Sequence, residues 1–564
     1  MADPYSRNRE EIAKLEIGHT TIGRLVATIL VCGFLLILYS IPIIQSVSDV
    51  KAFRDGGRTT PIPEAFSIIR GVSSSLFEFI HATGSITGRI FAANRVLKSE
   101  IDDYETRLEN TSVVSKYVLP STQYVLSGLL GAGNEKAVCG NDGWLFYRPD
   151  VEYLIGPGFM EQRKQLHRIR NESVQPDPIR AICALKNDLN RRGIDLLILP
   201  VPVKPMIHPE HLYGGFKKSD HPLHNPSYRA FVDTMKNRGI MVFDFGEVFA
   251  TIHKKITGSL YFKTDTHWLP ETMHAAAESL SSFLVDSGYV KPTARIPFQT
   301  ERTIVANSGD ITEMLRLPSD QLLYPPEEVS IRRIFMPDGT PWRPDRSSEI
   351  LVLGDSFSNI FSLADMGWGE SAGFVEQLSY ELGQTVDAVL RNDNGSFATR
   401  KVIYDESARG EDRLEGKRIV LYQFAVRELS QGDWEVYESF VSNETVDVFF
   451  CPDAGAEEIV SAKIKSISPI PRPFSVPYKD HIVTLHLFDV RTESGDDIPM
   501  EAVVYMWSMR NNELTAAASL RPGQSIHLRL SAWSDVSDNL ERINRGELMD
   551  IRLLSADPCW GDLL

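Results

Sequence analysis

The stretch that decides the fold is ILVLGDSFSNIF, residues 350–361. Its apolar start, residues 350–353, is typical of a strand buried on both faces of a parallel sheet. Gly354 then permits a tight turn, and Ser356 follows two residues later, before an expected helix. This order puts the Ser356 hydroxyl at the carboxyl edge of the sheet, where amides at the start of the helix can stabilise an anion. Taken alone, G-D-S is more often a serine that only caps a helix.

The alternation of strand and helix continues on both sides of this stretch. DPIRAICALKNDLNRRG, residues 177–193, reads as a helix, and IDLLILPVPVK, residues 194–204, reads as a buried strand. Further candidate strands are residues 240–245, 386–390 and 419–422. This alternation predicts an α/β fold in which helices cover a parallel sheet.

A second motif, YFKTDTHWLPETMHAAAESL at residues 261–280, places Asp265 and His267 in a turn before an alanine-rich helix. Such a pair can supply a general base and the group that orients it. His267 would take the proton from Ser356, while the Asp265 carboxylate holds the imidazole tautomer and stabilises the imidazolium. By itself, the pair is more simply interpreted as a buried histidine beside a capping aspartate.

We expect no metal site. The spacings of His253, His267 and His274 match no familiar ligand set, and the histidine–glutamate motif of zinc hydrolases is missing from the sequence. The five cysteines stand far apart, without a C-x-x-C pair. The four outside the apolar N-terminal segment can form disulfides in an oxidising compartment or remain free buried thiols.

One segment near the start has the length and composition of a membrane helix. Residues 25–44, LVATILVCGFLLILYSIPII, carry no charge and are long enough to cross a bilayer. No A-x-A cleavage site follows, which favours a retained anchor over a signal peptide. Basic residues flank both ends, so the positive-inside rule orients the segment only weakly. The net charge of -16 argues against a nucleic-acid partner.

The length of 564 residues predicts several domains. We expect a tail (1–24), an anchor (25–46), a helical stalk (47–135), the parallel-sheet domain (136–445) and a C-terminal β domain (452–564). The sequence changes character after Cys451, where the proline-rich SPIPRPFSVP leads into alternating runs such as IVTLHLFDV, typical of an antiparallel sheet. The aromatic residues of this last domain can stack on sugar rings or pack in a core: Tyr478, Trp507, Trp533 and Trp560.

Taken together, GDSFS at 354–358 and DTHW at 265–268 resemble the alginate O-acetyltransferases, a periplasmic family with an SGNH-hydrolase-like fold. NDGWLFYRPDVEYL, at 141–154, looks like the start of that family's domain, and PVPVKPMIHPEHLY, at 200–213, is similar to its proline and lysine segment. The resemblance covers roughly residues 140–429. It implies an acyltransferase that uses Ser356, His267 and Asp265 as nucleophile, base and orienting carboxylate.

In this family the aspartate–histidine pair precedes the serine, whereas in ordinary SGNH hydrolases it follows the serine. The resemblance therefore implies an α/β fold of the SGNH-hydrolase type with a permuted triad order. A single transmembrane helix and a helical stalk would precede this domain, and a smaller antiparallel β domain would follow it. One departure from the family is Asp355, which stands where a threonine is more common.

The resemblance also implies the remaining site residues. The amide of Ser356 would form the oxyanion hole together with Gly395 and Asn392. The residues expected to contact the substrate are Arg427, Trp268 and Lys204.

No bound cofactor is expected, because the family receives its acetyl donor from a partner. Acetyl-coenzyme A is cytosolic and one helix cannot form a passage, so the implied partner is a membrane-bound O-acyltransferase. The implied acceptor is an exported polysaccharide, such as alginate. The implied location is the bacterial inner membrane, with the catalytic part in the periplasm. A polysaccharide acetyl esterase with the same triad and a non-catalytic scaffold of an export complex are the alternatives.

Overall fold

The computed structural model describes residues 23–54, isolated positions from 63 to 105, and residues 112–564 except 173, 217–220, 256–257, 292–293, 438–448, 493–499, 549–552 and 554–555. The chain divides into two compact units, Met1–Val118 and Leu119–Leu564. Of the helical stalk expected at residues 47–135, residues 55–62 and most of residues 64–111 lie outside the described residues.

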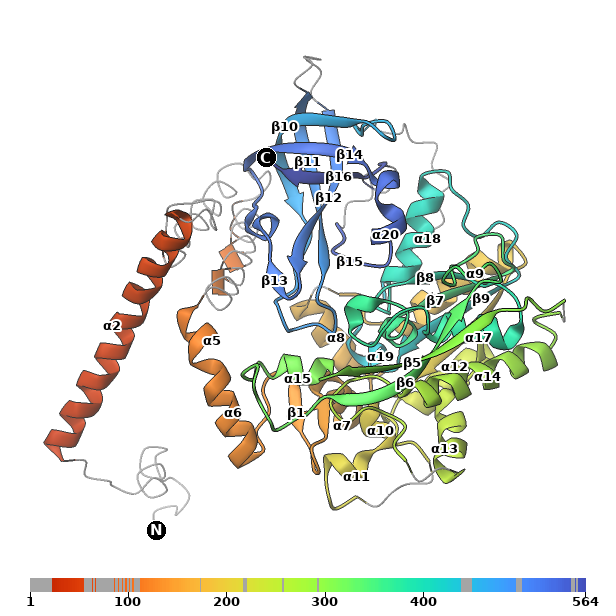
Figure 1. Ribbon diagram of the computed structural model, residues 1–564, viewed down its shortest axis with the longest axis horizontal. Coiled ribbons are helices and arrows are strands. Elements are labelled where there is room, and N and C mark those ends of the chain that lie inside the picture. The colour runs from red at the N-terminus through yellow and green to blue at the C-terminus, as the bar shows by residue number, and fades with distance from the viewer. Residues whose placement is uncertain are drawn as a thin grey trace, which may run out of the picture. The chain divides into compact units, whose positions relative to one another are not determined.

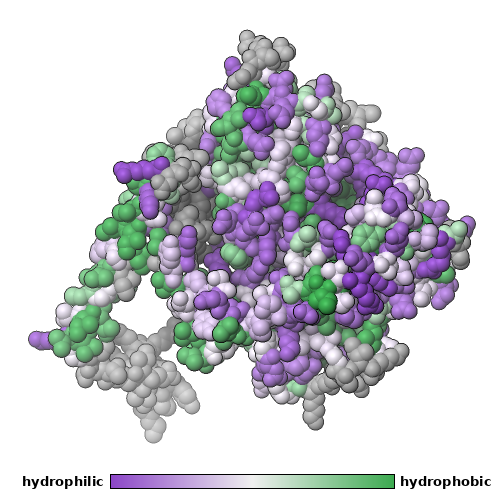
Figure 2. All heavy atoms as spheres, viewed as in Figure 1, coloured by the Kyte–Doolittle hydropathy of each residue, from purple (hydrophilic) through white to green (hydrophobic). Residues whose placement is uncertain are grey.

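The first unit contains helix α2, Arg24–Arg54, which includes the whole apolar segment singled out above. Its apolar stretch has a mean hydropathy of 2.5 and is not buried within the structure. Hydrophobic side chains follow the length of the helix (Figure 2). Among the described residues it is the one helix long and apolar enough to cross a membrane, although a signal sequence would meet the same criteria.

A five-stranded parallel sheet lies at the centre of the second unit (Figure 1). Its strand order is β4-β3-β9-β7-β8, and every neighbouring pair is parallel. The strands are β3 (Asp195–Val201), β4 (Met241–Val242), β7 (Ile350–Gly354), β8 (Asp387–Leu390) and β9 (Ile419–Ala425). Every residue of β7 and β9 is buried, as expected for strands covered on both faces.

Helices cover this sheet and share one hydrophobic core with it. The longer ones are α9 (Pro178–Arg191), α12 (Tyr228–Asn237), α13 (Phe245–Lys255), α14 (Pro270–Asp286), α17 (Phe374–Leu382) and α18 (Ala398–Ala408). The start of α9 has a clear local cause. The Asp177 side chain accepts hydrogen bonds from the amides of Ile179 and Arg180, and Pro178 occupies the first helical turn.

The strand expected at residues 240–245 is shorter than the sequence suggested. Only Met241 and Val242 pair with β3, because the chain turns at Asp244 and enters helix α13 at Phe245. The Asp244 carboxylate accepts a hydrogen bond from the amide of Gly246 at 2.8 Å, which fixes this turn.

Two hairpins and several short helices complete this domain. The hairpins are β1 (Ala137–Cys139) with β2 (Leu145–Tyr147) and β5 (Gln299–Asn307) with β6 (Glu327–Phe335). The short helices near the carboxyl edge of the sheet are α15 (Asp310–Met314), α16 (Ser356–Asn359) and α19 (Glu428–Gln431).

The C-terminal part, for which the sequence predicted an antiparallel β domain, is a closed β-barrel. Its strands are β10 (Glu457–Ile467), β11 (His481–Thr492), β12 (Met500–Arg510), β14 (Ser525–Ala532) and β16 (Cys559–Leu563). Around the barrel they follow the order β10-β11-β12-β16-β14 and return to β10. The pair β12–β16 is parallel. This connectivity is that of an OB-fold, a five-stranded Greek-key barrel.

The tryptophans that could stack on sugars form a small cluster beside the barrel's own core. Trp560 is buried and lies 5.7 Å from Trp507 and 6.1 Å from Trp533, measured between ring centroids, and the latter two are half-buried. Leu363 of the parallel-sheet domain packs against the same cluster. Tyr478 is buried against that same domain, so its ring is not available for stacking on a polymer.

Candidate active site

Ser356 occupies the turn between strand β7 and helix α16. Asp355 holds this turn, because its carboxylate accepts hydrogen bonds from the amide of Phe357 at 2.9 Å and the amide of Ala425 at 2.6 Å. The second bond joins the turn to the end of the neighbouring strand β9. Asp355 therefore has a defined structural role in this chain, whereas a threonine is more common in the family.

Gly354 is needed here for space rather than for an unusual backbone angle. A β-carbon at this position would lie 2.6 Å from Ser358 Oγ and 2.8 Å from a methyl group of Leu390. Gly354 is not among the residues with positive φ. Gly354 thus matters for packing space, and not for the conformational freedom that the sequence suggested.

The Asp265–His267 pair forms a tight hydrogen-bonded unit. Asp265 Oδ1 accepts hydrogen bonds from His267 Nδ1 at 2.7 Å and from the His267 amide at 3.1 Å. Because Nδ1 donates to the carboxylate, Nε2 carries the lone pair that a general base needs. Burial alone would raise the pKa of Asp265, but the hydrogen bond and charge of His267 outweigh it and lower that pKa below its usual range.

Two residues that the sequence analysis missed hold the other oxygen of this carboxylate. Asp265 Oδ2 accepts hydrogen bonds from Trp368 Nε1 at 2.8 Å and from the amide of Asp310 at 3.0 Å. The Asp310 amide can approach Asp265 because the preceding residue is a glycine. Gly309 has a φ of 78° and lies against the backbone of Thr264, where a β-carbon would be 2.5 Å from the Thr264 carbonyl oxygen. The S-G-D sequence at 308–310 was a weak signal of such a turn, and Trp368 had no signal.

The carboxyl group of Asp310 is a second acidic group beside His267. Its Oδ2 lies 4.0 Å from His267 Nδ1, and its Oδ1 accepts a hydrogen bond from the amide of Thr266 at 2.7 Å. Burial and the nearby negative charge of Asp265 raise the pKa of Asp310 to about 7. The histidine therefore has two carboxyl groups beside its Nδ1 edge.

Ser356 and His267 approach each other from different parts of the chain. Both are fully buried, and the His267 ring lies 4.8 Å from the ring of Phe357, the residue that follows the serine. Ser356 Oγ and His267 Nε2 are both without a hydrogen-bond partner among the described residues, and so are not bonded to each other. Catalytic hydrogen bonds are often long before substrate binds and shorten in the reacting complex.

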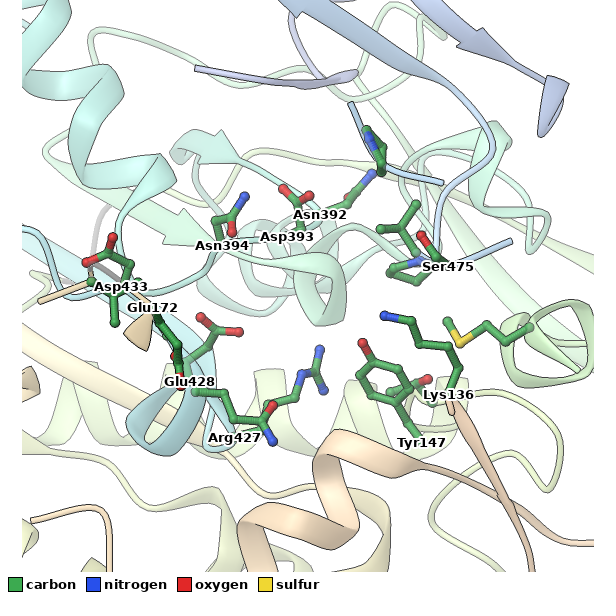
Figure 3. A pocket seen from close by; sticks show the side chains of 18 of the residues that line it. Lys136, Tyr147, Glu172, Asn392, Asp393, Asn394, Arg427, Glu428, Asp433 and Ser475 are labelled. Atoms are coloured by element: carbon green, nitrogen blue, oxygen red, sulfur yellow. The ribbon is translucent and has the colours of Figure 1, made fainter. Parts of the chain in front are cut away.

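A cavity of about 560 Å³ lies beside these residues (Figure 3). Thr266, between Asp265 and His267, forms part of its wall, whereas Ser356, His267 and Asp265 themselves lie behind the residues that line it. Arg427, Glu428 and Tyr147 face it on one side, and the loop residues Asn392–Asn394 face it on the other.

Asn392 is the better placed of the two expected oxyanion residues. Its Oδ1 accepts a hydrogen bond from Asn359 at 2.7 Å, while its buried Nδ2 has no partner in the part of the chain that the structure describes. Asn392 lines the cavity with other atoms, and its unpartnered Nδ2 remains a candidate donor. Gly395 packs against Asp355 and does not line the cavity, and its carbonyl oxygen accepts a hydrogen bond from Tyr422 at 2.7 Å.

Of the three expected substrate contacts, the structure brings only Arg427 to the cavity. Its guanidinium pairs with Asp150 at 3.0 Å. Lys204 is fully buried elsewhere, and its ammonium donates to the carbonyl oxygens of Leu145 at 2.6 Å and Lys263 at 3.1 Å. Trp268 is also fully buried, with its ring edge-on to Phe357. Neither Lys204 nor Trp268 can touch a polymer from these positions.

Among the described residues, two groups of side chains are close enough together to hold a metal ion. In the first, both ring nitrogens of His208 are already engaged, by Glu210 at 3.3 Å and by the amide of Leu260 at 3.1 Å. The second is the set Asp265, His267 and Asp310, whose hydrogen bonds are those described above. Hydrogen bonding accounts for both arrangements.

Comparisons with known proteins point to one family. The family model described as "SGNH hydrolase-like domain, acetyltransferase AlgX" matches residues 137–414. The probable alginate O-acetylase AlgJ of Pseudomonas aeruginosa is 26% identical over 235 residues, which are 40% of this chain and 54% of that protein. The alginate biosynthesis protein AlgX of the same organism is 27% identical over 124 residues, which are 22% of this chain and 26% of that protein. The chain thus spans about half the length of the AlgJ relative, and less of AlgX.

Two solved structures resemble parts of this chain. The O-acetyltransferase domain of Pseudomonas putida AlgJ aligns with a TM-score of 0.40 and 20% identity, covering 53% of this chain and 93% of that domain. Pseudomonas aeruginosa AlgX aligns with a TM-score of 0.38 and 16% identity, covering 70% of this chain and 90% of that protein.

Proposed function

Residues 137–414 belong to the AlgJ/AlgX family of SGNH hydrolase-like domains, and on that premise we propose that this protein is a serine-dependent O-acetyltransferase acting on an exported polysaccharide. The observation that carries the proposal is the buried Asp265–His267 pair. Its free Nε2 lies on the side of the imidazole away from Asp265, in the same buried region as the unpartnered hydroxyl of Ser356. The triad order is then permuted, with the aspartate and histidine before the serine.

In the first half of the reaction, Ser356 Oγ attacks the carbonyl carbon of an acetyl donor. His267 Nε2 accepts the serine proton, and Asp265 stabilises the imidazolium. The amide of Ser356 and the Nδ2 group of Asn392 donate to the oxyanion of the tetrahedral intermediate. When this intermediate collapses, the leaving group departs with the proton from His267, and the acetyl group remains on Ser356 as an ester.

In the second half, a sugar hydroxyl attacks the acetyl-serine carbonyl. His267 takes the proton of this hydroxyl and returns it to Ser356 Oγ as the ester bond breaks, so that the enzyme is restored. A positioned base of this kind contributes ~10²–10⁴-fold to the rate. One oxyanion donor contributes ~10²–10³-fold in kcat.

The donor has to reach this site from elsewhere, because no cofactor is part of the proposed chemistry. We propose that α2 anchors the protein in the bacterial inner membrane, with the catalytic part in the periplasm. A membrane-bound O-acyltransferase would then pass acetyl groups to Ser356. The alginate O-acetylase names of the relatives support a polysaccharide acceptor.

The test uses the full-length chain in detergent with p-nitrophenyl acetate as the donor. Intact-protein mass spectrometry should find one added acetyl group on the wild type and none on Ser356→Ala. Absence of the adduct from both proteins would contradict the proposal and favour a non-catalytic scaffold.

A second step then separates a transferase from an esterase. Alginate oligosaccharides, and in a parallel reaction cello-oligosaccharides, are added to the acetylated enzyme. Acetylated sugar detected by mass spectrometry supports the transferase, and release of acetate alone, whichever acceptor is present, supports a polysaccharide acetyl esterase.

A further inference from the structure

The loop after strand β8 carries Asn392, the oxyanion donor of the proposed reaction, and the C-terminal barrel holds this loop. The amide of Asn392 donates to Asn544 Oδ1 at 2.6 Å. Asn544 is 1% exposed and lies in the short strand β15, Asn544–Arg545, which pairs in parallel with β11 of the barrel. The acceptor for this buried amide therefore comes from another domain of the protein.

The two neighbours of Asn392 are bound to the barrel domain as well. Arg391, which is 4% exposed, donates to the carbonyl oxygen of Glu541 at 2.7 Å and pairs with its carboxylate at 3.1 Å. On the other side, the Tyr478 hydroxyl donates to the carboxylate of Asp393. Three consecutive residues of the loop thus each have a polar contact with the C-terminal domain.

The side chain of Asn392 is fixed from both ends by these contacts. Its Oδ1 is bonded to Asn359 in helix α16, one turn after Ser356, and its backbone is bonded to Asn544. With both ends held, the buried Nδ2 keeps one orientation and has no partner among the described residues. An oxyanion donor has to be fixed before the charge develops, since reorientation during the reaction would lose the stabilisation it gives.

We propose that Asn544 is a positioning residue of the active site and that the barrel completes the oxyanion hole. This inference rests on the proposed function, because it assigns Asn544 an effect that passes through Asn392. A further observation agrees with it. The loop between β10 and β11 supplies Pro471, Ser475, Val476 and Pro477 to the wall of the same cavity. The barrel is thus part of the catalytic site rather than a detachable binding module.

The test is a double-mutant cycle on the full-length chain, with the turnover of p-nitrophenyl acetate as the readout. Asn392→Ala should lower kcat by ~10²–10³-fold. Asn544→Ala should lower kcat by roughly tenfold to a hundredfold with little change in KM, since a small misplacement of a catalytic group has that effect. In the Asn392→Ala background, Asn544→Ala should have no further effect on kcat, because the group it positions has already gone.

Val460→Ala serves as the control. Val460 is fully buried in the barrel's own hydrophobic core and belongs to none of the contacts with the Asn392 loop described above. Its loss should lower the thermal unfolding midpoint and leave kcat unchanged. If Asn544→Ala does not yield folded protein, Tyr478→Phe removes another contact to the same loop with less disturbance, and the same cycle with Asn392→Ala applies.

The possible results separate the two proposals. A wild-type protein that does not react with the ester overturns the proposed function, whatever the variants do. A reactive wild type with an equally fast Asn544→Ala overturns this inference alone. The inference is also overturned if Asn544→Ala lowers kcat by the same factor in the wild-type and the Asn392→Ala backgrounds. Asn544 would then act on kcat by a route that does not pass through Asn392.

Discussion

Asp265 is saturated with hydrogen bonds: Oδ1 accepts two from His267, and Oδ2 accepts one each from Trp368 and Asp310. A carboxylate can accept all of these, whereas a carboxamide of the same shape has one donor end. Position 265 therefore needs an aspartate for its charge and for its four acceptor sites.

We accordingly expect Asp265→Asn to lower kcat for the acetyl ester by ~10⁴-fold, because the imidazole then loses its orienting charge and its tautomer. The measurement is steady-state ester turnover. Asp244→Asn is the control, since Asp244 is a well-bonded aspartate that accepts from Tyr228 at 2.9 Å and lies outside the site. Equal activity of the two variants would contradict a triad role for Asp265.

Asp310 gives a prediction about pH. Its pKa is raised by burial and by Asp265 to about 7, so the folded protein binds this proton more tightly than the unfolded chain does. The free energy of unfolding should therefore fall as the pH rises from about 4 to about 7. Asp310→Asn keeps the acceptor for the Thr266 amide and should flatten this dependence, as measured by thermal unfolding at a series of pH values. An unchanged slope in the variant would show that another group titrates.

At the scale of elements, the turn from β7 to α16 leaves no room for a side chain at position 354. We expect Gly354→Ala to destabilise the fold by about 1–3 kcal/mol, because the added methyl group overlaps Ser358 and Leu390. The shift of the turn should also move Ser356 and lower kcat. Urea unfolding and ester turnover measure the two effects. Gly258→Ala is the control, since a β-carbon there meets no described atom within 4 Å.

The elements that could be predicted from sequence are those whose signal is local. The buried strands β3, β7, β8 and β9 each show as a short apolar run, and α9 shows its capping aspartate and proline. What could not be predicted depends on pairing across long stretches of chain. Barrel closure needs β16 to insert between β12 and β14, and no local pattern encodes that insertion.

The same division holds for the site. Ser356, His267 and Asp265 stand in motifs with recognisable chemistry. Asp310, Trp368 and Asn544 carry no motif, and their importance follows from partners that are distant in sequence. Lys204 shows the opposite error. Its place in a segment similar to the family predicts a substrate contact, whereas its ammonium donates to two buried carbonyl groups.

At the scale of the whole molecule, α2 makes a prediction about the membrane. An exposed apolar helix of this length should keep the protein in the membrane fraction after an alkaline carbonate wash, and detergent should release it. A variant without residues 1–54 should remain in the supernatant. Amino-terminal sequencing of the mature protein is the second measurement, since a new terminus after residue 44 would identify a cleaved signal instead.

The closed barrel has a consequence for the order in which activity arises during synthesis. The central sheet is complete once β9 has emerged, whereas β10 has to wait about a hundred residues for β16, on the order of 5–20 s at typical elongation rates. During that interval the catalytic domain has its serine and histidine, but the closed barrel that holds the Asn392 loop has not yet formed. A nascent chain, or one whose translation stops early, would therefore be a poor catalyst. Acetyl transfer would thus become efficient only after the whole polypeptide has been synthesised and the barrel has closed.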